Sequence, residues 1–337
     1  MSSEFEVAIV GATGAVGAEL IQLLEQREFP LRRLKLLASP KSAGKVLKFK
    51  GEELPVEVLS QDSFRSIDIA LFSAGAARSK EYAPHAVNAG AVVIDNSSAF
   101  RMEPDVPLVV PEINPADIQK HRGIIANPNC TTIIALMALY PLHKVFRVKR
   151  VIASSYQAVS GAGAKAIDEL LLQTKSFLSG KAATPEVFPY TIAFNVLPQV
   201  DVFLDNGYTK EEVKFVNESR KIMHHPTLRA SITCVRVPVF RAHSIAVNAE
   251  FEQPISVERA RDVLAKFPGL ELMDDPSTRK YPTPLLVAGK NNCQVGRVRA
   301  DSALDNGIAF WVCGDQLLKG AALNALQIAE TLANRRP

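Results

Sequence analysis

The sequence predicts an α/β protein of two domains, with a parallel-sheet domain at the N-terminus followed by a mixed α+β domain. A chain of 337 residues is long enough for about two domains. In the first part, short apolar strands alternate with helices, and a glycine-rich loop joins the first strand to the first helix. Such alternation is typical of a doubly wound parallel sheet. From residue 150 onwards, strands also follow one another without a helix between them, which indicates a mixed sheet.

The composition excludes several classes of protein. Hydrophobic residues make up 47% of the chain and charged residues 22%, which is ordinary for a soluble globular protein. The net charge of +4 is not gathered into runs, so we expect no nucleic-acid surface, although a few basic side chains could meet at one anionic ligand. No apolar run reaches the length of a membrane span, so no membrane partner is expected.

The four cysteines form no CxxC pair and no zinc-binding spacing with histidine. We therefore expect no metal site and no disulfide bond, as in a reduced cytoplasmic protein. We expect no signal or transit segment before the first strand at Phe5. The expected location is the cytoplasm, with a plastid as the alternative if a transit peptide was removed.

A glycine-rich loop follows the first strand directly. Phe5 to Val10 forms the strand, GATGAVG at Gly11 to Gly17 the loop, and a helix with Leu20, Leu23 and Leu24 on its apolar face follows. In this context the G-x-x-G-x-x-G spacing indicates dinucleotide binding, because glycine lets the backbone approach a pyrophosphate held at the helix N-terminus. Glycines at such a turn can also be purely steric, but their position after the first strand favours a dinucleotide site.

The loop after the second strand predicts which dinucleotide is bound. The strand Leu34 to Leu37 ends in ASPKSAGK at Ala38 to Lys45. NAD-specific sites usually carry an acidic residue here to hold the ribose 2′-hydroxyl. This loop instead holds Ser39, Lys41 and Ser42, whose hydroxyls and cation suit a 2′-phosphate, so we predict NADP. An ordinary polar loop is the alternative.

Further strands complete the parallel sheet. They are expected at residues 68–72, 91–94, 108–110 and 123–126, with a helix at 79–89. The strand 68–72 ends in Ser73-Ala74-Gly75. Small residues at the carboxyl end of a strand mark where a doubly wound sheet binds its ligand, so Ser73, Ala74 and Gly75 join the candidate cofactor site.

A cysteine lies at the junction of a strand and a helix in the stretch Ile124 to Leu139. Asn127-Pro128-Asn129 forms the turn, and Cys130 falls where an apolar helix begins. The unpaired N–H groups and the dipole of a helix N-terminus stabilise a thiolate, which is the nucleophilic form of cysteine. A buried structural cysteine is the alternative interpretation.

The second half of the chain predicts a mixed sheet with helices. The loop-rich residues 180–208 end at a capping box, Thr209 to Glu212, which opens a helix to about residue 223. We expect the last helix, residues 320–334, to pack back on the first domain. Strands are expected at 150–156, 231–238, 243–251, 295–300 and 307–313, with helices at 255–266 and at 164–178, the latter carrying Ile167, Leu170, Leu171 and Leu178 on one face.

Seven motifs occur in order along the chain. They are GATGAVG at 11–17, ASPKSAGK at 38–45, DNSSAFR at 95–101, NPNCTT at 127–132, SYQAVSGAG at 155–163, RVPVFRAHS at 236–244 and KGAALNALQIAE at 319–330. Together they resemble the aspartate-β-semialdehyde dehydrogenase family along essentially the whole chain. The resemblance implies a Rossmann-type NADP-binding domain, residues 1–129 with 318–337, and a mixed α+β catalytic, substrate-binding and dimerisation domain, residues 130–317. It also implies a homodimer or homotetramer.

Members of this family use NADPH to reduce L-4-aspartyl phosphate to L-aspartate 4-semialdehyde and phosphate. The reaction leads to lysine or diaminopimelate, threonine, methionine and isoleucine. By resemblance, Cys130 is the nucleophile, His243 the acid/base and Gln157 the substrate-binding glutamine. Arg236 matches the arginine that grips the substrate carboxylate. The phosphate-binding residues match Arg101, Asn129 and Lys214, and the family's glutamate three residues before that lysine matches Glu211.

The cofactor contacts of the family also match positions in this chain. With the first glycine of the loop, the candidate NADP contacts are Gly11, Thr13, Gly14, Ala15, Val16, Lys41, Ser42, Asn324 and, near the nicotinamide, Ser160 and Gly161. One departure is Pro40-Lys41, where the family often has Ala-Arg. Lysine keeps the positive charge but lacks the planar fork of arginine.

The implied reaction requires residues of these types. An acyl phosphate is a mixed anhydride whose carbonyl a thiolate attacks, and the resulting thioester accepts a hydride. His243 can take the thiol proton and later protonate the oxygen, because imidazole titrates near neutral pH. Backbone N–H groups at the Asn129–Cys130 turn are candidates for an oxyanion hole. Arg236 offers a bidentate grip on a carboxylate, and Arg101 and Lys214 offer cations for a phosphate.

Simpler interpretations of these residues follow from spacing alone. His243 could be a packed strand residue, Gln157 a strand-end polar residue, and Glu211 with Lys214 a solvated helix face. The other three cysteines are interpreted as structural. Two functions are kept as alternatives: N-acetyl-γ-glutamyl-phosphate reductase, which performs the same chemistry on a longer, acylated substrate, and an NADP-binding paralogue without catalysis.

Overall fold

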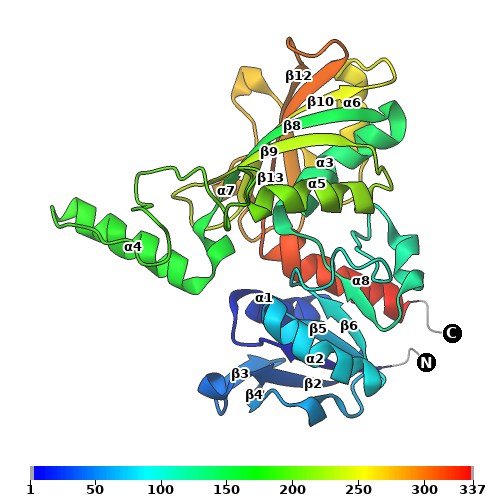
Figure 1. Cartoon of the computed structure of the whole chain (residues 1–337), viewed down its shortest axis with the longest axis vertical. Helices are drawn as coiled ribbons and strands as arrows, with labels where there is room; N and C mark the ends of the chain where they lie inside the picture. The colour runs from blue at the N-terminus through cyan, green and yellow to red at the C-terminus, as the bar shows by residue number, and fades with distance from the viewer. Residues whose placement is uncertain (1–3, 335–337) are drawn as a thin grey trace. The chain divides into compact units, whose positions relative to one another are not determined.

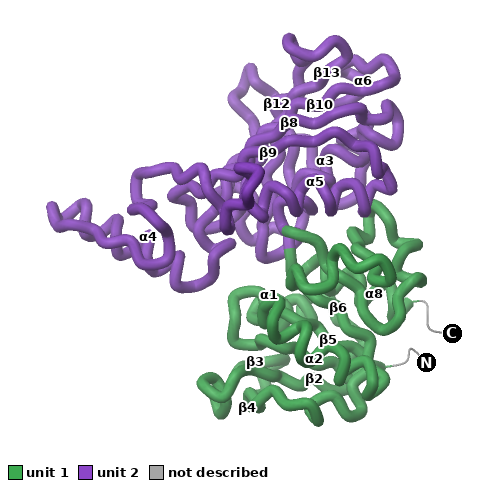
Figure 2. Tube along the Cα trace, in the orientation of Figure 1, with its two compact units in different colours: residues 1–129, 321–337 green, residues 130–320 purple. Residues whose placement is uncertain are grey.

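The computed structural model describes residues 4–334 and divides into two compact units. Unit 1 comprises residues 1–129 and 321–337, and unit 2 comprises residues 130–320 (Figure 2). The outermost residues of the first predicted domain, 1–3 and 335–337, lie outside the described residues. Within the described residues, no helix combines the length and apolar character needed to cross a membrane. No cluster of three or more metal-ligating side chains occurs in residues 4–334.

Unit 1 is built on a seven-stranded sheet in the order β3-β4-β2-β1-β5-β6-β7. Six of these strands, β4-β2-β1-β5-β6-β7, pair in parallel, and residues Val7 to Val10 of β1 are fully buried. A continuous apolar run is what a strand covered on both faces requires. The bounds are β1 Phe5–Val10, β2 Leu31–Ala38, β3 Val46–Phe49, β4 Glu52–Val58, β5 Ile69–Phe72, β6 Val92–Asp95 and β7 Ile124–Ala126 (Figure 1).

Two features of this sheet differ from the prediction. Residues 46–58 form an antiparallel hairpin, β3 with β4, and β4 pairs with β2 in parallel. The hairpin was not predicted, because its strands are exposed and polar apart from a few apolar positions. Residues 108–110 were predicted as a strand, which is wrong: they make a single bridge, from Leu108 to Ala126. Their burial comes from packing and not from a ladder of backbone hydrogen bonds.

Three helices belong to unit 1: α1 (Ala15–Gln26), α2 (Ala76–Asn88) and α8 (Leu323–Ala333). The last helix packs against α1 and β6, as expected from its alanine- and leucine-rich sequence. An ion pair between Arg27 and Glu330, with Nε to Oε1 at 2.6 Å, joins the two helices at the surface. Short 3₁₀ turns occur at η1 (Pro40–Ser42), η2 (Gln61–Phe64) and η3 (Pro115–Lys120).

Unit 2 is built on a six-stranded sheet in the order β11-β12-β13-β10-β8-β9. The central strands β13, β10 and β8 pair antiparallel, while β9 pairs with β8 in parallel. The sheet is therefore mixed, as the sequence predicts. The bounds are β8 Val148–Gln157, β9 Arg229–Arg236, β10 His243–Phe251, β11 Leu270–Leu272, β12 Cys293–Ala300 and β13 Gly307–Gly314.

The longer helices that contact this sheet are α3 (Cys130–Phe146), α5 (Lys210–Ile222) and α6 (Val257–Ala265), and the short α7 (Pro284–Val287) also contacts β13. The predicted capping box of α5 is confirmed, since the Thr209 hydroxyl accepts from the Glu212 N–H and the Glu212 carboxylate accepts from the Thr209 N–H. A capping box satisfies two N–H groups that the first helical turn leaves open. The remaining elements are η4 (Val159–Ala162), η5 (Pro276–Thr278) and a π-turn, η6 (Leu318–Ala322).

Helix α4 (Ala164–Leu178) extends away from the sheet of unit 2 (Figure 1). The predicted helix has the expected bounds, but the face with Ile167, Leu170, Leu171 and Leu178 is only partly buried. Leu170 is buried, but Leu171 and Leu178 are exposed. The buried side packs on Val159, Ile192, Ala193 and Leu197, which form a small core of their own. Because this core is short, the distal part of α4 keeps its apolar side chains in solvent.

Two stacked imidazoles join the ends of three elements of unit 2. The rings of His143, near the end of α3, and His225, after α5, lie 5.2 Å apart. His143 Nδ1 accepts from the N–H of Val148 at 3.2 Å, and His225 Nε2 lies 3.0 Å from the carbonyl oxygen of the same residue. Burial, followed by the charges of His225 and Arg147, lowers the pKa of His143 to about 4.

This pair predicts a loss of stability in mild acid. A histidine whose pKa is lowered on folding stabilises the fold fully above its unfolded value of 6.5, and the contribution falls as the pH drops from 6.5 towards 4. We expect a loss of about 2 kcal/mol across this window, after a discount for partial exposure. Urea unfolding at a series of pH values measures it. The variant His143→Gln should flatten the slope, and an equally steep slope in that variant would contradict the assignment.

Candidate active site

Three strand ends of unit 2 bring together three predicted site residues. Gln157 is the last residue of β8 and Arg236 the last of β9, and the two are direct partners in the parallel register. His243 is the first residue of β10, which runs antiparallel to β8 and therefore starts at the same end of the sheet. All three side chains are buried. The sheet topology thus places an amide, a guanidinium and an imidazole at one edge.

The N-terminus of α3 reaches the same place. Cys130 is the first residue of α3 and is partly exposed. The next residue, Thr131, accepts a hydrogen bond from Gln157 Nε2 to its hydroxyl oxygen at 2.7 Å. Gly320 lies against the cysteine: a Cβ on this glycine would be 2.9 Å from the Cys130 Cβ, so only glycine fits without displacement. The thiol therefore sits at the positive end of a helix dipole, which favours its thiolate form.

Glu211, on the first turn of α5, is buried and holds two other candidates. Its Oε1 lies 3.4 Å from Gln157 Nε2, and its Oε2 lies 3.3 Å from Lys214 Nζ. Lys214 also pairs with Asp201 at 2.7 Å. Burial disfavours the charged lysine, but Glu211 and Asp201 outweigh this and raise its pKa. Glu211 is buried and Lys214 is mostly buried, so the two residues do not form a solvated helix face.

Arg236 is held by the backbone and lies in a desolvated setting. Its Nη1 donates to the carbonyl oxygen of Ala158 at 2.7 Å, and its Nε has no hydrogen-bond partner within residues 4–334. Burial lowers the pKa of the guanidinium, while the charges of Glu211 and then Cys130 oppose this. Arginine stays protonated at any physiological pH. The side chain is thus a buried cation with donors left for an anionic ligand.

His243 is fully buried, and its two ring nitrogens have different surroundings. Nδ1 accepts from the N–H of Ala158 at 3.0 Å, whereas Nε2 has no partner in the part of the chain that the structure describes. Burial, and secondly the charge of Arg236, lowers the pKa of His243 well below 6.5. The imidazole is therefore neutral at physiological pH. With Nδ1 acting as an acceptor, the proton of the neutral ring lies on Nε2.

The loop after β8 lies against both of these side chains. A Cβ on Gly161 would be 3.0 Å from Arg236 Nη1 and 3.2 Å from His243 Cε1. Glycine at this position therefore lets the backbone lie close to the guanidinium and the imidazole. The neighbouring Ser160 is buried, and its hydroxyl oxygen accepts from Gln316 Nε2.

The glycine loop of unit 1 has the geometry of an anion site. Gly11 has φ +91°, and a Cβ there would lie 2.4 Å from the Ser73 carbonyl oxygen. A Cβ on Gly17 would lie 2.3 Å from the Gly11 carbonyl oxygen. Gly14 caps α1 without a side-chain hydrogen bond, and no acidic residue occupies the first turn, which contains Ala15 and Val16. The N–H groups at the start of α1 are thus available to a phosphate.

Other predicted cofactor residues of unit 1 border this loop. Thr13 Oγ1 lies 3.3 Å from Ser42 Oγ, which links the glycine loop to the turn after β2. Lys41 is exposed on η1, in the same turn. Ser73 and Ala74 follow β5, and Gly75 caps α2 with φ +86°. These residues therefore surround one end of the parallel sheet, at the carboxyl ends of β1, β2 and β5.

Arg101 and Asn324 meet at the backbone and side chain of Asn127. Arg101 Nε donates to the Asn127 carbonyl oxygen at 2.9 Å, and Asn324 Nδ2 donates to Asn127 Oδ1 at 2.7 Å and to the Val109 carbonyl oxygen at 2.9 Å. Asn324 is fully buried, and Asn129 and Arg101 are nearly so. The asparagine turn before Cys130 is therefore held by long-range contacts within unit 1, among them those of Arg101 and Asn324. The two units divide the predicted residues, with Arg101, Asn129 and Asn324 in unit 1 and Lys214, Ser160 and Gly161 in unit 2.

Residues that the sequence analysis did not identify complete the surroundings of the unit 2 site. Thr131 and Ser155 hold the Gln157 amide, with the Ser155 hydroxyl at 3.2 Å from Nε2. Thr131 could have been found from its place beside Cys130. Ser155 carries no signal in the sequence, because its contact depends on how the Gln157 side chain points. Gln316 carries none because its contacts join distant segments.

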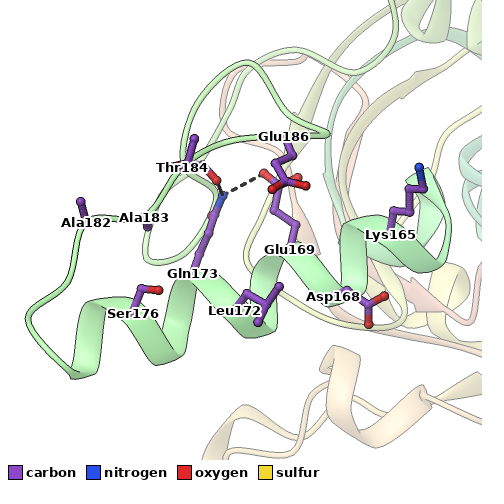
Figure 3. A pocket seen from close by; sticks show the side chains of 10 residues that line it. All are labelled: Lys165, Asp168, Glu169, Leu172, Gln173, Ser176, Ala182, Ala183, Thr184 and Glu186. Carbon is purple, nitrogen blue, oxygen red and sulfur yellow. Dashed lines mark hydrogen bonds between the residues drawn. The ribbon is translucent and has the colours of Figure 1, made fainter.

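A pocket of about 410 Å³ lies apart from these residues, between α4 and the chain at 182–186 (Figure 3). Glu169 and Gln173 point across it, and Gln173 Nε2 donates to Glu169 Oε1 at 2.8 Å and to the Thr184 carbonyl oxygen at 3.3 Å. The pocket contains none of the predicted site residues. Its polar groups are occupied in holding the 182–193 segment to α4, so we assign it no role in catalysis.

The four cysteines differ in exposure, which predicts selective alkylation. Cys234, Cys293 and Cys313 are buried, and burial raises the pKa of Cys234 and raises that of Cys313 to about 11. Because the thiolate is the reactive form, we expect iodoacetamide to label Cys130 alone in the folded chain. Mass spectrometry of tryptic peptides would locate the label, and Cys130→Ser should take up none. Labelling of a buried cysteine as fast as Cys130 would refute this.

Comparisons with known proteins agree with this architecture. Residues 6–121 match the family model described as semialdehyde dehydrogenase, NAD binding domain, and residues 139–319 match semialdehyde dehydrogenase, dimerisation domain. The predicted fold class is thereby confirmed. Aspartate-semialdehyde dehydrogenase of Synechocystis sp. is 52% identical over 99% of both chains, and that of Aquifex aeolicus is 53% identical over 97% of this chain and 98% of its own.

Solved structures give the same result. The crystal structure of aspartate semialdehyde dehydrogenase II from Vibrio cholerae superposes with a TM-score of 0.97 at 47% identity, covering 99% of this chain and all of the other. A structure of the same enzyme complexed with ASA matches equally well, at a TM-score of 0.97 and 47% identity over 100% of both chains. This chain therefore belongs to the aspartate-semialdehyde dehydrogenase family.

Proposed function

We propose that this chain reduces L-4-aspartyl phosphate to L-aspartate 4-semialdehyde and phosphate with NADPH, through a thioester on Cys130. One observation carries the proposal: Gln157, Arg236 and His243 meet at one sheet edge, and Gln157 is bonded to the residue after Cys130. A nucleophile, an anion-binding cation and a proton carrier in one place are the parts that acyl transfer needs. The relatives' name supplies the substrate.

Cys130 performs the first step. Its thiolate attacks the acyl carbon, the C–O bond to phosphate breaks, and a thioester and inorganic phosphate result. NADPH, when bound, supplies a hydride to the thioester carbonyl carbon. The thiohemiacetal then collapses, the C–S bond breaks, and the thiolate returns to Cys130 with release of the aldehyde. The N–H groups at the start of α3 stabilise negative charge on both the sulfur and the carbonyl oxygen.

His243 acts in this scheme as a hydrogen-bond donor. Its lowered pKa keeps the ring neutral, and the bond from Ala158 to Nδ1 leaves the proton on Nε2. A neutral imidazole with Nε2–H can donate to the carbonyl oxygen while the tetrahedral intermediate forms. The expectation that His243 also removes the thiol proton is less well supported by this tautomer. Thiolate formation then rests on the helix terminus and the neighbouring cations.

The substrate's anionic groups have candidate partners. Arg236, with a free Nε and a fixed Nη1, suits the α-carboxylate. Arg101 and Lys214 are the proposed cations for the phosphate, with Asn129 as a polar partner, and Glu211 keeps Lys214 and Gln157 in place.

The proposed cofactor is NADP. The free N–H groups of α1 suit the pyrophosphate, and Lys41 and Ser42 suit the 2′-phosphate in a turn that has no acidic residue. The proposed contacts along the rest of the dinucleotide are those predicted from sequence, namely Gly11, Thr13 to Val16, Ser73 to Gly75, Ser160, Gly161 and Asn324. The pathway assignment, to lysine, threonine, methionine and isoleucine, belongs to the same proposal.

The assay that tests this function runs the reverse reaction. With L-aspartate 4-semialdehyde, phosphate and either NADP or NAD, we expect NADP to be reduced faster, and Cys130→Ser to lose at least about a thousandfold in kcat, because a serine hydroxyl is a far weaker nucleophile. The N-acetyl-γ-glutamyl semialdehyde is the control substrate. Preference for that longer substrate would overturn the substrate assignment, and full activity of Cys130→Ser would overturn the thioester.

A homodimer, or a tetramer built from dimers, is also proposed. Unit 2 contains the residues that match the dimerisation domain, and it exposes large apolar side chains on α4 and on the chain that follows. The ring centroids of Phe177 and Phe194 lie 4.7 Å apart with the planes tilted by 44°, and 63% and 62% of the two residues' surfaces are exposed. Apolar surface of this kind on one segment marks an interaction site, and a second copy is the proposed occupant.

Sedimentation equilibrium tests the dimer. We expect at least twice the chain mass of 36.7 kDa at micromolar concentration. Replacement of Phe177 and Phe194 by aspartate should shift the mass towards the monomer, because charge at a buried contact is costly. Leu285→Asp changes an apolar side chain that is 90% exposed on α7 and is the matched control. A monomeric wild-type chain would refute the proposal.

A further inference from the structure

The backbone directly before His243 is held in a conformation that L-residues rarely adopt. Ala242 has φ +74°, is fully buried, and is followed at once by β10. A left-handed backbone at a residue with a Cβ persists only where surrounding contacts enforce it. The direction of the His243 side chain starts from this backbone. The contact that enforces the conformation therefore controls where the imidazole points.

Gln316 makes that contact. Its Oε1 accepts from the N–H of Ala242 at 2.7 Å, and its Nε2 donates to the hydroxyl oxygen of Ser160. Gln316 is buried, so neither end of the carboxamide can exchange its partner for bulk water. An orphaned buried N–H would cost free energy, which makes this pairing strongly preferred. One side chain thus joins two segments that are 82 residues apart, Ser160 and Ala242.

The position of Gln316 is itself fixed. It follows β13, whose last residue, Gly314, pairs with His243 in the antiparallel register. The fully buried Asp315 accepts from the N–H of Leu317 at 2.9 Å and from Arg241 Nε at 2.6 Å. Two consecutive residues, 315 and 316, therefore hold two consecutive residues, 241 and 242. In the segment that leads into His243, Arg241 is bound through its side chain and Ala242 through its backbone N–H.

Both contacts of Gln316 lead to the same imidazole. Through Ala242 it acts on the residue that carries the ring. Through Ser160 it acts on the loop in which the neighbouring Gly161 lies against the ring. That loop begins after Ala158, whose N–H donates to His243 Nδ1. The imidazole is thus framed on two sides by groups that one glutamine connects.

We propose that Gln316 is a positioning residue, which sets the orientation of His243 through Ala242 and the place of the adjoining loop through Ser160. The inference rests on the proposed function only in its expected effect on the reaction rate, and the effect on the His243 ring does not depend on it. Gln316 lies within unit 2 together with every group it is argued to act on.

Substitution separates a positioning role from a purely structural one. Gln316→Met keeps the length of the side chain but removes both hydrogen bonds. We expect kcat to fall by roughly 10- to 100-fold, because a misplaced proton donor loses most of its effect, with KM for the semialdehyde within about twofold. Gln316→Glu keeps an acceptor for Ala242, and Ser160 can turn its hydroxyl to donate to the other oxygen. This variant should recover kcat to within about fivefold of wild type.

The imidazole itself gives a second readout that needs no substrate. The His243 Cε1–H signal in an NMR titration is assigned by its loss in His243→Asn. In the wild type it should not titrate near neutral pH. In Gln316→Met it should shift and titrate closer to 6.5, and in Gln316→Glu the added carboxylate should raise the pKa by favouring the imidazolium. Thermal unfolding shows whether each variant is folded.

The proposal is overturned if Gln316→Met keeps the wild-type kcat and the wild-type imidazole signal. It is also overturned if a folded Gln316→Glu is as impaired as Gln316→Met in both readouts. A wild-type chain that does not oxidise the semialdehyde would count against the proposed function. The imidazole titration would then still decide the role of Gln316.

Discussion

The parallel pairing of β8 with β9 is the constraint on which the unit 2 site depends. Parallel neighbours require a long crossover, and here the chain between Gln157 and Arg229 supplies it. The register pairs Gln157 with Arg236 directly, so an amide and a guanidinium meet wherever this pairing forms. The crossover also contains α5, which packs on β9 and presents Glu211 to Gln157. The parallel pairing and its crossover therefore bring Gln157, Arg236 and Glu211 together. His243 joins them because β10 runs antiparallel to β8 and begins at the same end of the sheet.

The electrostatics of the site follow from burial. Arg236 is removed from water, which is costly for a cation unless a counter-charge is near. Glu211 supplies part of that charge, but it also serves Lys214 and Gln157, so it is shared among three partners. An anionic ligand at Arg236 would relieve this imbalance. Burial also disfavours the charged form of His243, and the cation of Arg236 beside it adds to this effect, so the neutral imidazole is favoured.

The sequence was sufficient for most of the fold because its signals are local. The bounds of β1, α4 and β10 follow from apolar periodicity and adjacent glycine or proline residues, and the α5 capping box is a four-residue pattern. The hairpin 46–58 and the bridge at Leu108 could not be predicted, since the first is polar and the second is buried without pairing. The hairpin is paired without being apolar, and residues 108–110 are apolar without being paired as a strand. Apolar periodicity detects burial and cannot detect pairing.

The candidate site shows a similar division. Cys130 was found from its helix terminus and the glycine loop from its strand, but Gln157, Arg236 and His243 were assigned only by resemblance, because no spacing in the sequence shows that three strand ends meet. The contacts of Thr131, Ser155 and Gln316 needed coordinates. These residues contact the candidate side chains, or the backbone beside them, through hydrogen bonds that depend on the folded structure, and such a polar residue looks like any other polar residue in the sequence.

The distribution of the candidate residues over the two units has a consequence for mechanism. Cys130, Gln157, Arg236 and His243 all lie in unit 2, and the glycine loop and the turn with Lys41 lie in unit 1. In the proposed mechanism, thiol activation and the grip on a carboxylate belong to the sheet of unit 2 and its helices, and dinucleotide recognition belongs to the sheet of unit 1. Within unit 2, Glu211, Thr131 and Ala158 hold the proposed catalytic side chains, and within unit 1, Ser42, Ser73 and Gly17 shape the proposed dinucleotide site. If both proposals hold, acyl transfer to Cys130 depends on the order of the unit 2 sheet, and the choice between NADP and NAD depends on the exposed turn with Lys41 in unit 1.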